Sequence, residues 1–168
     1  MGVLIGMAGK GLDLDEEDLE KLKEIRKKLN ISNDNDYRIE IIKLLLALEH
    51  YGYSITYTEK GWNWNYIETK NWSATIHVKK DRNVSNNFFF NVSLHHIEQY
   101  DYFIFICDRY RFFYIIPKDK MRELSNVSTV KGTQIKININ DFEHTFRPGD
   151  GKKIEIDRYY QKIDLLTK

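Results

Sequence analysis

The chain has 168 residues, of which 42% are hydrophobic and 30% are charged. This size and composition predict one ordinary domain with a sizeable core, and they exclude a disordered linker protein. The net charge of +1, from 26 basic and 25 acidic residues, excludes a uniformly basic nucleic-acid coat protein but permits a local basic patch.

Two helices are predicted in the N-terminal third. They follow the stretch MGVLIGMAGKG, which lacks the basic lead-in and the longer apolar core of a signal peptide. Residues 13–29 repeat Leu and Ile at helical spacing, with acids in the first turns and bases in the last. Residues 36–51 carry a wide apolar face, and Gly52 stands where a helix C-cap is expected. We predict an N-terminal helical segment over 1–37 and an α/β core over 38–168, together forming a single compact domain.

After the second helix the pattern changes to the alternation that is typical of strands. Residues 102–107 are apolar throughout and predict a central strand that is buried on both faces. Further strands are predicted over 53–59, 62–68, 75–79, 88–92, 112–116 and 135–139 (an edge strand), short helices over 94–99 and 118–124, a loop over 140–151 and a terminal helix over 154–166. This order predicts an α/β fold with a mixed central sheet flanked by helices.

The lack of a long apolar run and the single cysteine narrow the class of protein further. No apolar run approaches the roughly 18–20 residues that a membrane span needs, so we expect no membrane partner. The single cysteine, Cys107, excludes a disulfide scaffold and is typical of a protein in a reducing cytoplasm. Because it lies inside an apolar strand, we expect it to be a core residue and not a nucleophile.

One segment has the residue order of a known nuclease family. An apolar helix carries Glu40, three strands follow, and the third strand reads Ile-His-Val-Lys and ends at Lys79. This order resembles the core of the PD-(D/E)XK, or restriction-endonuclease-like, nuclease superfamily. There, a helix contributes a Glu, one strand supplies an Asp, and the next supplies an acid, any residue and a Lys. The resemblance covers about residues 38–166. It includes the segment Tyr-Ile-Ile-Pro, which ends at Pro117.

The resemblance implies a restriction-endonuclease-like fold and a metal-dependent DNA endonuclease of restriction, repair or homing type. The implied cofactor is Mg²⁺ or Mn²⁺, and the implied partners are DNA and a second copy of the chain, so that both strands are cut. Lys79 would orient or activate the attacking water near the scissile phosphate.

The chain departs from the family pattern at both acidic positions. His77 stands where the second acid belongs, and Asn65 is the best match to the first. Neutral amides bind Mg²⁺ less well than carboxylates do, and His77 is either a general base near neutral pH or the mark of a site that has lost its metal. Glu68 and Glu40 are the nearby carboxylates that can replace the missing acids. The implied catalytic residues are therefore Glu40, Glu68, His77 and Lys79, and the implied metal ligands are Glu40, Asn65 and Glu68.

Two clusters of cations and amides are candidate DNA contacts. A basic, polar loop follows Lys79, and a second turn carries two arginines. Lysine and arginine neutralise phosphates, whereas asparagine bonds phosphate oxygens or base edges. We expect DNA contacts from Lys80, Arg82, Asn83, Asn86, Arg109 and Arg111.

Two other functions stay open. One is a catalytically degenerate module on the nuclease fold, which binds DNA or a protein partner without cutting it. The other is a DNA-binding regulator that uses the two helices across residues 13–51 in the manner of a ribbon-helix-helix protein, with an unrelated sensing domain behind them. Convergence of the five implied site residues around one ion favours catalysis over either alternative.

Overall fold

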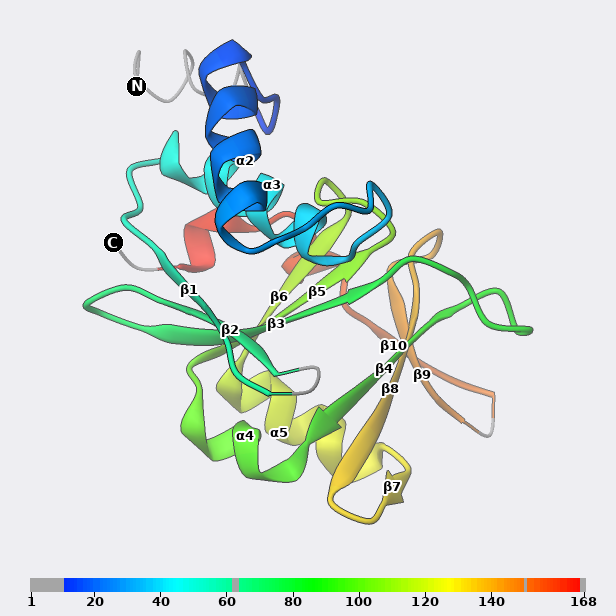
Figure 1. Cartoon of the computed structure of the whole chain (residues 1–168). Helices are drawn as coiled ribbons and strands as arrows, with labels where there is room; N and C mark the ends of the chain where they lie inside the picture. The colour runs from blue at the N-terminus through cyan, green and yellow to red at the C-terminus, as the bar shows by residue number, and fades with distance from the viewer. Residues whose placement is uncertain (1–10, 62–63, 150, 167–168) are drawn as a thin grey trace.

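The computed structural model describes residues 11–61, 64–149 and 151–166, which form an α/β structure with two β-sheets (Figure 1). Most of the N-terminal stretch MGVLIGMAGKG and the start of the strand predicted over 62–68 lie outside the described residues. Within the described ranges, no helix has the length and apolar character needed to cross a membrane.

Two helices form the N-terminal layer, as predicted: α2 (Glu16–Lys28) and α3 (Arg38–Glu49). α2 begins with a capping box, in which the carboxylates of Asp15 and Asp18 each accept a hydrogen bond from the other residue's backbone N–H. α3 is apolar over most of its surface and is therefore buried between α2 and the first sheet. The chain leaves α3 through Gly52, whose φ of 89° lies in the left-handed region that glycine adopts without strain.

The first sheet has the strand order β1-β2-β3-β5-β6. Its strands are β1 (Thr56–Glu59), β2 (Asn65–Glu68), β3 (Ser73–Lys79), β5 (Tyr102–Cys107) and β6 (Phe113–Pro117). β1, β2 and β3 form an antiparallel meander, β5 pairs with β3 in parallel, and β6 pairs with β5 antiparallel. The prediction that residues 102–107 form an interior strand is confirmed, since β5 lies between two partners.

A second sheet corrects three sequence-based predictions for the C-terminal half. Its strands are β4 (Phe88–Ser93), β7 (Val130–Lys131), β8 (Gln134–Asn140), β9 (Thr145–Gly149) and β10 (Lys152–Glu155), in the order β10-β9-β8-β4 with β7 beside β8. β8 is an interior strand, not an edge strand, because β4 and β9 pair with it. β9 occupies part of the predicted loop over 140–151. The predicted helix over 154–166 is instead the end of β10 and two short 3₁₀ turns, Asp157–Tyr159 and Ile163–Leu165.

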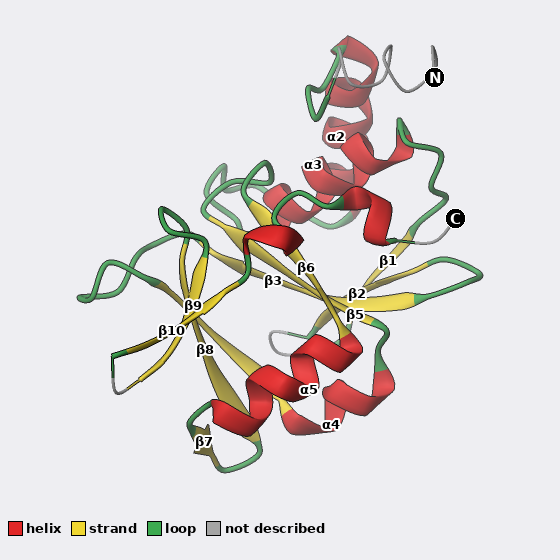
Figure 2. Cartoon of the chain, turned by 180° about the vertical axis from the view of Figure 1, so that it is seen from behind, coloured by secondary structure: helices red, strands yellow, loops and turns green. Residues whose placement is uncertain are grey.

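The two faces of the first sheet bury different partners. Helices α4 (Leu94–Gln99) and α5 (Lys118–Val127) lie together on the side opposite α3 (Figure 2). Phe103 and Phe105 of β5 pack toward these helices and the second sheet, whereas Ile104 packs beneath α3. β5 is therefore covered on both faces and anchors both halves of the core.

Replacing Ile104 with alanine should lower the free energy of unfolding by about 2–5 kcal/mol, because the substitution leaves a cavity between β5 and α3. Denaturant unfolding of the variant and the wild type measures this difference. Val84→Ala is the control on a fully exposed loop, and it should change the stability by less than about 0.5 kcal/mol. An equally small effect at Ile104 would contradict the two-sided burial of β5.

Candidate functional site

β3 carries His77 and Lys79 on the face that looks toward the second sheet, because side chains alternate along a strand. The His77 ring stacks on Phe105 of β5, with 5.2 Å between ring centroids and 17° between the planes. Its Nε2 lies 2.9 Å from Oγ1 of Thr75. Burial, aided by the nearby His96, lowers the pKa of His77 from 6.5 to about 3. The ring is therefore neutral at neutral pH, and its pKa lies far below that of an efficient general base there.

Glu68 lies at the opposite end of β3 from Lys79. The antiparallel register pairs Glu68 with Ser73, the first residue of β3, whereas Lys79 is the last. At about 3.3 Å per residue, these two ends are roughly 20 Å apart. The structure therefore does not bring the Glu68 carboxylate to Lys79, and the two residues cannot share a metal ion.

Asn65 lies on the face that α3 covers, because it is two residues from Ile67, which packs in the α3 core. The Asn65 side chain is buried, its Oδ1 accepts a hydrogen bond from the Tyr57 hydroxyl at 2.7 Å, and its Nδ2 donates to the Tyr37 hydroxyl at 3.3 Å. Tyr37 in turn donates to Oε2 of Glu59 at 3.2 Å. Asn65 is thus held in a tyrosine network, on the face opposite to His77 and Lys79.

Glu40 meets Lys80 and not Lys79. Its carboxylate is buried in the first turn of α3, and Oε1 accepts a hydrogen bond from the backbone N–H of Tyr110 at 3.0 Å. Oε2 lies 3.6 Å from Nζ of Lys80. Glu40 therefore ties α3 to the β5–β6 turn and to the chain that follows β3.

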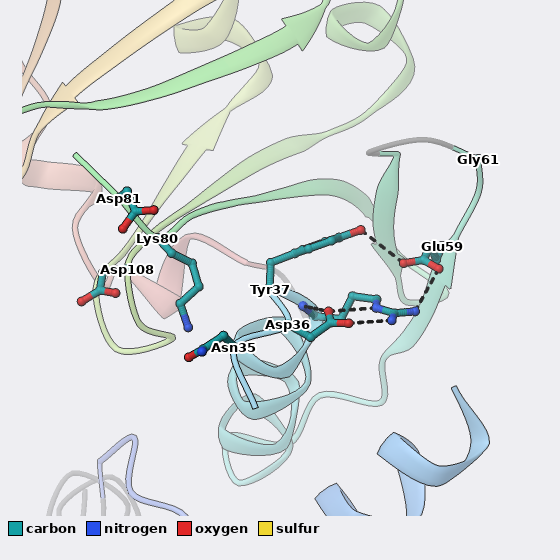
Figure 3. Close-up of a pocket in the computed structure, with 9 residues that line it drawn as sticks. Asn35, Asp36, Tyr37, Glu59, Gly61, Lys80, Asp81 and Asp108 are labelled. Atoms are coloured by element: carbon teal, nitrogen blue, oxygen red, sulfur yellow. Dashed lines mark hydrogen bonds and ion pairs between the residues drawn. The ribbon is translucent and has the colours of Figure 1, made fainter. Parts of the chain in front are cut away.

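A cavity of about 890 Å³, which we call the acidic cavity, opens beside Lys80 where the parallel strands β3 and β5 end (Figure 3). Asp36 and Glu59 line it, and both are paired with Arg38, at 2.7 Å and 3.3 Å. The hydrogen bond from Arg38 is the main cause that lowers the pKa of Asp36. Asp108, on the far wall, has a left-handed φ of 73°. The cavity thus combines several carboxylates with two cations, of which Arg38 already pairs with Asp36 and Glu59.

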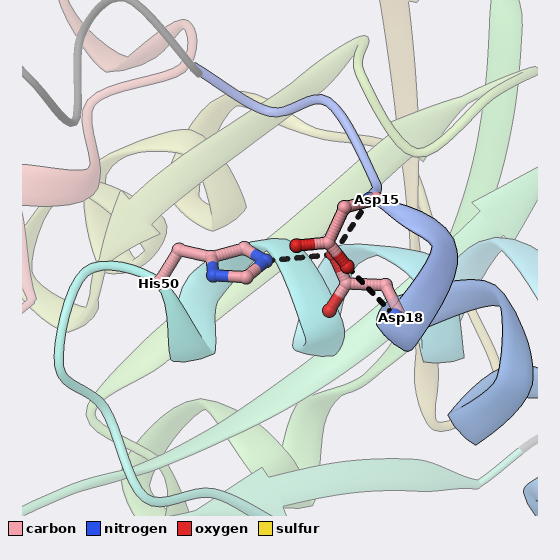
Figure 4. A group of neighbouring side chains, drawn as sticks. All are labelled: Asp15, Asp18 and His50. Atoms are coloured by element: carbon pink, nitrogen blue, oxygen red, sulfur yellow. Dashed lines mark hydrogen bonds and ion pairs between the residues drawn. The ribbon is translucent and has the colours of Figure 1, made fainter.

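One group of three metal-type donors lies close together in the described part of the chain: Asp15, Asp18 and His50, with ligand atoms within 4.8 Å of one another (Figure 4). Asp18 is 2% exposed, and its Oδ2 accepts the Asp15 N–H and lies 2.7 Å from Nε2 of His50. This group fastens the start of α2 to the end of α3. It contains none of the three residues that the resemblance implies as metal ligands, and a donor set with a histidine suits Zn²⁺ better than Mg²⁺.

The basic loop after β3 is built into the fold. Arg82 donates two hydrogen bonds to Asp141, at 2.5 and 2.8 Å, and its guanidinium lies 4.6 Å and 4.3 Å from the ring centroids of Phe88 and Phe142. The Asn83 carboxamide oxygen accepts backbone hydrogen bonds within the loop. These two expected DNA contacts therefore have structural roles.

The other expected DNA contacts differ in how far they are engaged. Arg111 is paired with Asp13, and Lys80 with Glu40. Arg109 is exposed, and its nearest carboxylate, on the preceding residue, is 4.0 Å away. Asn86 is also exposed. Little of the expected basic surface is therefore left unneutralised at these two turns.

His77 and Lys79 instead line a second cavity, of about 560 Å³, which lies between the two sheets and which we call the inter-sheet cavity. β2 pairs with β3 only as far as Thr75, and β4 is the edge strand of its sheet, so two open strand edges face this space in the described structure. The residues that line it include the aromatic residues Trp64, His77, Phe89 and His96 and the amide residues Asn91 and Gln134. Lys79 is the only lysine or arginine among the described lining residues, and none of them is Asp or Glu.

Sequence reasoning placed His77 and Lys79 but missed the opposite wall of the inter-sheet cavity. Asn91 belongs to a strand whose alternate residues are buried, which indicates a half-exposed face. Gln134 faces the cavity only because β8 pairs with β4, with Ser93 opposite Gln134. That pairing joins segments about forty residues apart and leaves no local signal.

Comparisons with protein-family models, with curated proteins and with solved structures give no match for this chain. The resemblance of residues 38–166 to the PD-(D/E)XK superfamily therefore stays a prediction.

Acid should destabilise the protein through His77. The unfolded-state pKa of about 6.5 exceeds the folded-state pKa of about 3, so between these values only the unfolded chain binds the proton. The histidine therefore costs nothing above about pH 6.5, and stability falls as the pH drops below it. His77→Gln should reduce the loss between about pH 7 and pH 4, by on the order of 1–3 kcal/mol, in denaturant unfolding.

The matched control is His95→Gln, which changes an exposed histidine of α4 and should keep the wild-type pH dependence. Parallel stability profiles for the wild type and His77→Gln would refute the role of His77.

Asp18→Ala should lower the free energy of unfolding by about 1–2 kcal/mol, because it removes a helix-cap acceptor and leaves His50 without its carboxylate. Thermal and denaturant unfolding measure the loss. Glu17→Ala, next to it on the exposed face of α2, should change stability by less than about 0.5 kcal/mol. Equal effects of the two substitutions would mean that the cap and the His50 contact stabilise nothing.

Proposed function

We propose that this chain is a nucleic-acid-binding module that does not hydrolyse its ligand and is built on a restriction-endonuclease-like core. The observation that carries the proposal is the position of Lys79, on the wall of the inter-sheet cavity among rings and amides, with no carboxylate among the described lining residues. This is the catalytically degenerate alternative, with nucleic acid as its partner.

The element order of the first half supports a restriction-endonuclease-like core. α3 is followed by the antiparallel meander β1-β2-β3, and β5 then pairs beside β3 inside the sheet. This is the helix, three strands and buried strand that the resemblance implies, with Lys79 at the end of the third strand.

Hydrolysis is disfavoured by the positions of the carboxylates. Metal-dependent cleavage needs acids that hold a divalent ion and its water beside the lysine. Glu40 is occupied by Tyr110 and Lys80, and Glu68 is at the other end of the strand. No Asp or Glu is among the described residues that line the cavity beside Lys79, so this site favours binding over cleavage.

The lining of the inter-sheet cavity supports nucleic acid as the partner. An exposed lysine contacts phosphate, amides bond base edges or phosphate oxygens, and aromatic rings stack on bases. Use of the N-terminal helices as a DNA-reading segment is less well supported. Eight of the twelve residues of α3 are buried, which leaves that helix little surface for a groove.

Lys79→Ala should weaken nucleic-acid binding and reduce the slope of log affinity against log salt by about one, because one phosphate contact is lost. Fluorescence anisotropy with labelled oligonucleotides over a series of salt concentrations measures both quantities. Lys70→Ala is the matched control, since Lys70 is exposed in the β2–β3 turn at the other end of the first sheet. It should bind as the wild type does.

The same preparations are incubated with supercoiled plasmid and Mg²⁺ or Mn²⁺, and we expect no nicking. Nicking that Lys79→Ala abolishes would overturn the non-hydrolytic proposal in favour of a metal-dependent endonuclease. Unchanged affinity and salt slope in Lys79→Ala would remove the inter-sheet cavity from the binding surface.

A further inference from the structure

We infer that the inter-sheet cavity receives one unpaired base of a single-stranded nucleic acid while Lys79 contacts the adjoining phosphate. This inference rests on the proposed function and specifies its ligand class. It follows from the cavity's size, its two supported aromatic rings, its amide rim and its distribution of charge.

The volume of about 560 Å³ suits a single nucleotide. Small-molecule sites commonly enclose about 300–1,000 Å³. A base in a duplex is stacked and paired, so it cannot enter a cavity between two sheets unless it first leaves the helix. A base in a single strand, or at an unpaired position, enters without that cost.

Two aromatic rings of the cavity are backed by the protein. His77 is stacked on Phe105, and the indole of Trp64 lies 4.8 Å from the His96 ring, centroid to centroid. The Trp64 Nε1–H also donates to the Tyr100 hydroxyl at 2.8 Å. Rings held in this way lose little freedom when a base stacks on them, which favours binding.

The rim on the second sheet supplies amides that suit the edge of a base. Asn91 and Gln134 are both exposed, and they lie on one face because Gln134 pairs with Ser93 in the register of β4 and β8. Each amide offers donors and an acceptor, which is what base edges require. Lys136, opposite Asn91 in the register, adds a second cation on this face.

Charge is distributed so that a base and its phosphate are separated. The neutral His77 ring lies in the half-buried part of β3, whereas Lys79 at the strand end is exposed. An uncharged base is accommodated against the His77 ring, and an anionic phosphate stays hydrated beside Lys79. The cavity therefore orients a nucleotide as well as accepting one.

The test compares three labelled ligands of about 12 nucleotides per strand: a single strand, a perfect duplex, and a duplex with one unpaired nucleotide. We expect the single strand and the interrupted duplex to bind about 5–150-fold more tightly than the perfect duplex, since stacking contributes about 1–3 kcal/mol per base. They should also quench tryptophan fluorescence, and Trp64→Phe should lose most of that quenching.

Gln134→Ala should lower affinity for the two ligands with unpaired bases and leave duplex affinity unchanged. This second variant keeps the test independent of Trp64→Phe, which changes a residue that packs against the core. Gln99→Ala is the matched control, because Gln99 is an exposed glutamine of α4 that does not line the cavity. Circular dichroism confirms that each variant is folded.

The outcomes separate this inference from the proposed function. Equal affinity for all three ligands, with no quenching, overturns the base-binding inference and leaves nucleic-acid binding in place. If none of the three ligands binds at low salt, both the inference and the proposed function are overturned. Tighter binding of the single strand that Gln134→Ala abolishes supports both.

Discussion

The parallel pairing of β3 with β5 determines what each residue at the end of β3 does. Six residue pairs fix the register of the two strands, and side chains alternate between the faces. Ile76 and Val78 therefore pack beneath α3, and His77 and Lys79 face the second sheet. A shift of one residue would exchange the two sets, leaving the apolar core beneath α3 without its side chains. The inter-sheet cavity depends on this register.

The same register gives two consecutive lysines different roles. Lys80 turns back toward α3 and lies 3.6 Å from the buried Glu40. A buried carboxylate without a cation or hydrogen-bond donors is strongly destabilising. Lys80 and the Tyr110 N–H therefore stabilise the fold by compensating the buried Glu40 carboxylate. Lys79 has no such duty, because no carboxylate lines its cavity in the described structure. The chain thus uses one cation for folding and leaves its neighbour available to an anionic ligand.

Sequence reasoning succeeded where the signal is local and failed where the partner is distant. Both long helices and the buried strand 102–107 follow from periodicity within one segment. The turn residues Pro148 and Gly149 predict a loop, yet pairing with β8 makes this segment the strand β9. A helix is predicted over 154–166, but its apolar residues pack on the second sheet, on β6 and in the core beneath α3 in extended and 3₁₀ conformations.

The candidate site shows the same division. The positions of His77 and Lys79 follow from one strand, whereas Glu68 and Asn65 depend on the β2–β3 hairpin. Antiparallel pairing places the end of β2 beside the start of β3, so Glu68 is necessarily remote from Lys79. Strand alternation likewise turns Asn65 toward α3 and His77 away from it.

Replacing Asn65 and His77 with acids would therefore not rebuild a metal site. An acid at Asn65 would face two tyrosine hydroxyls, and an acid at His77 would lie on the opposite face of the sheet. The proposal of binding without cleavage therefore rests on the geometry of the sheet as much as on the identities of these two residues.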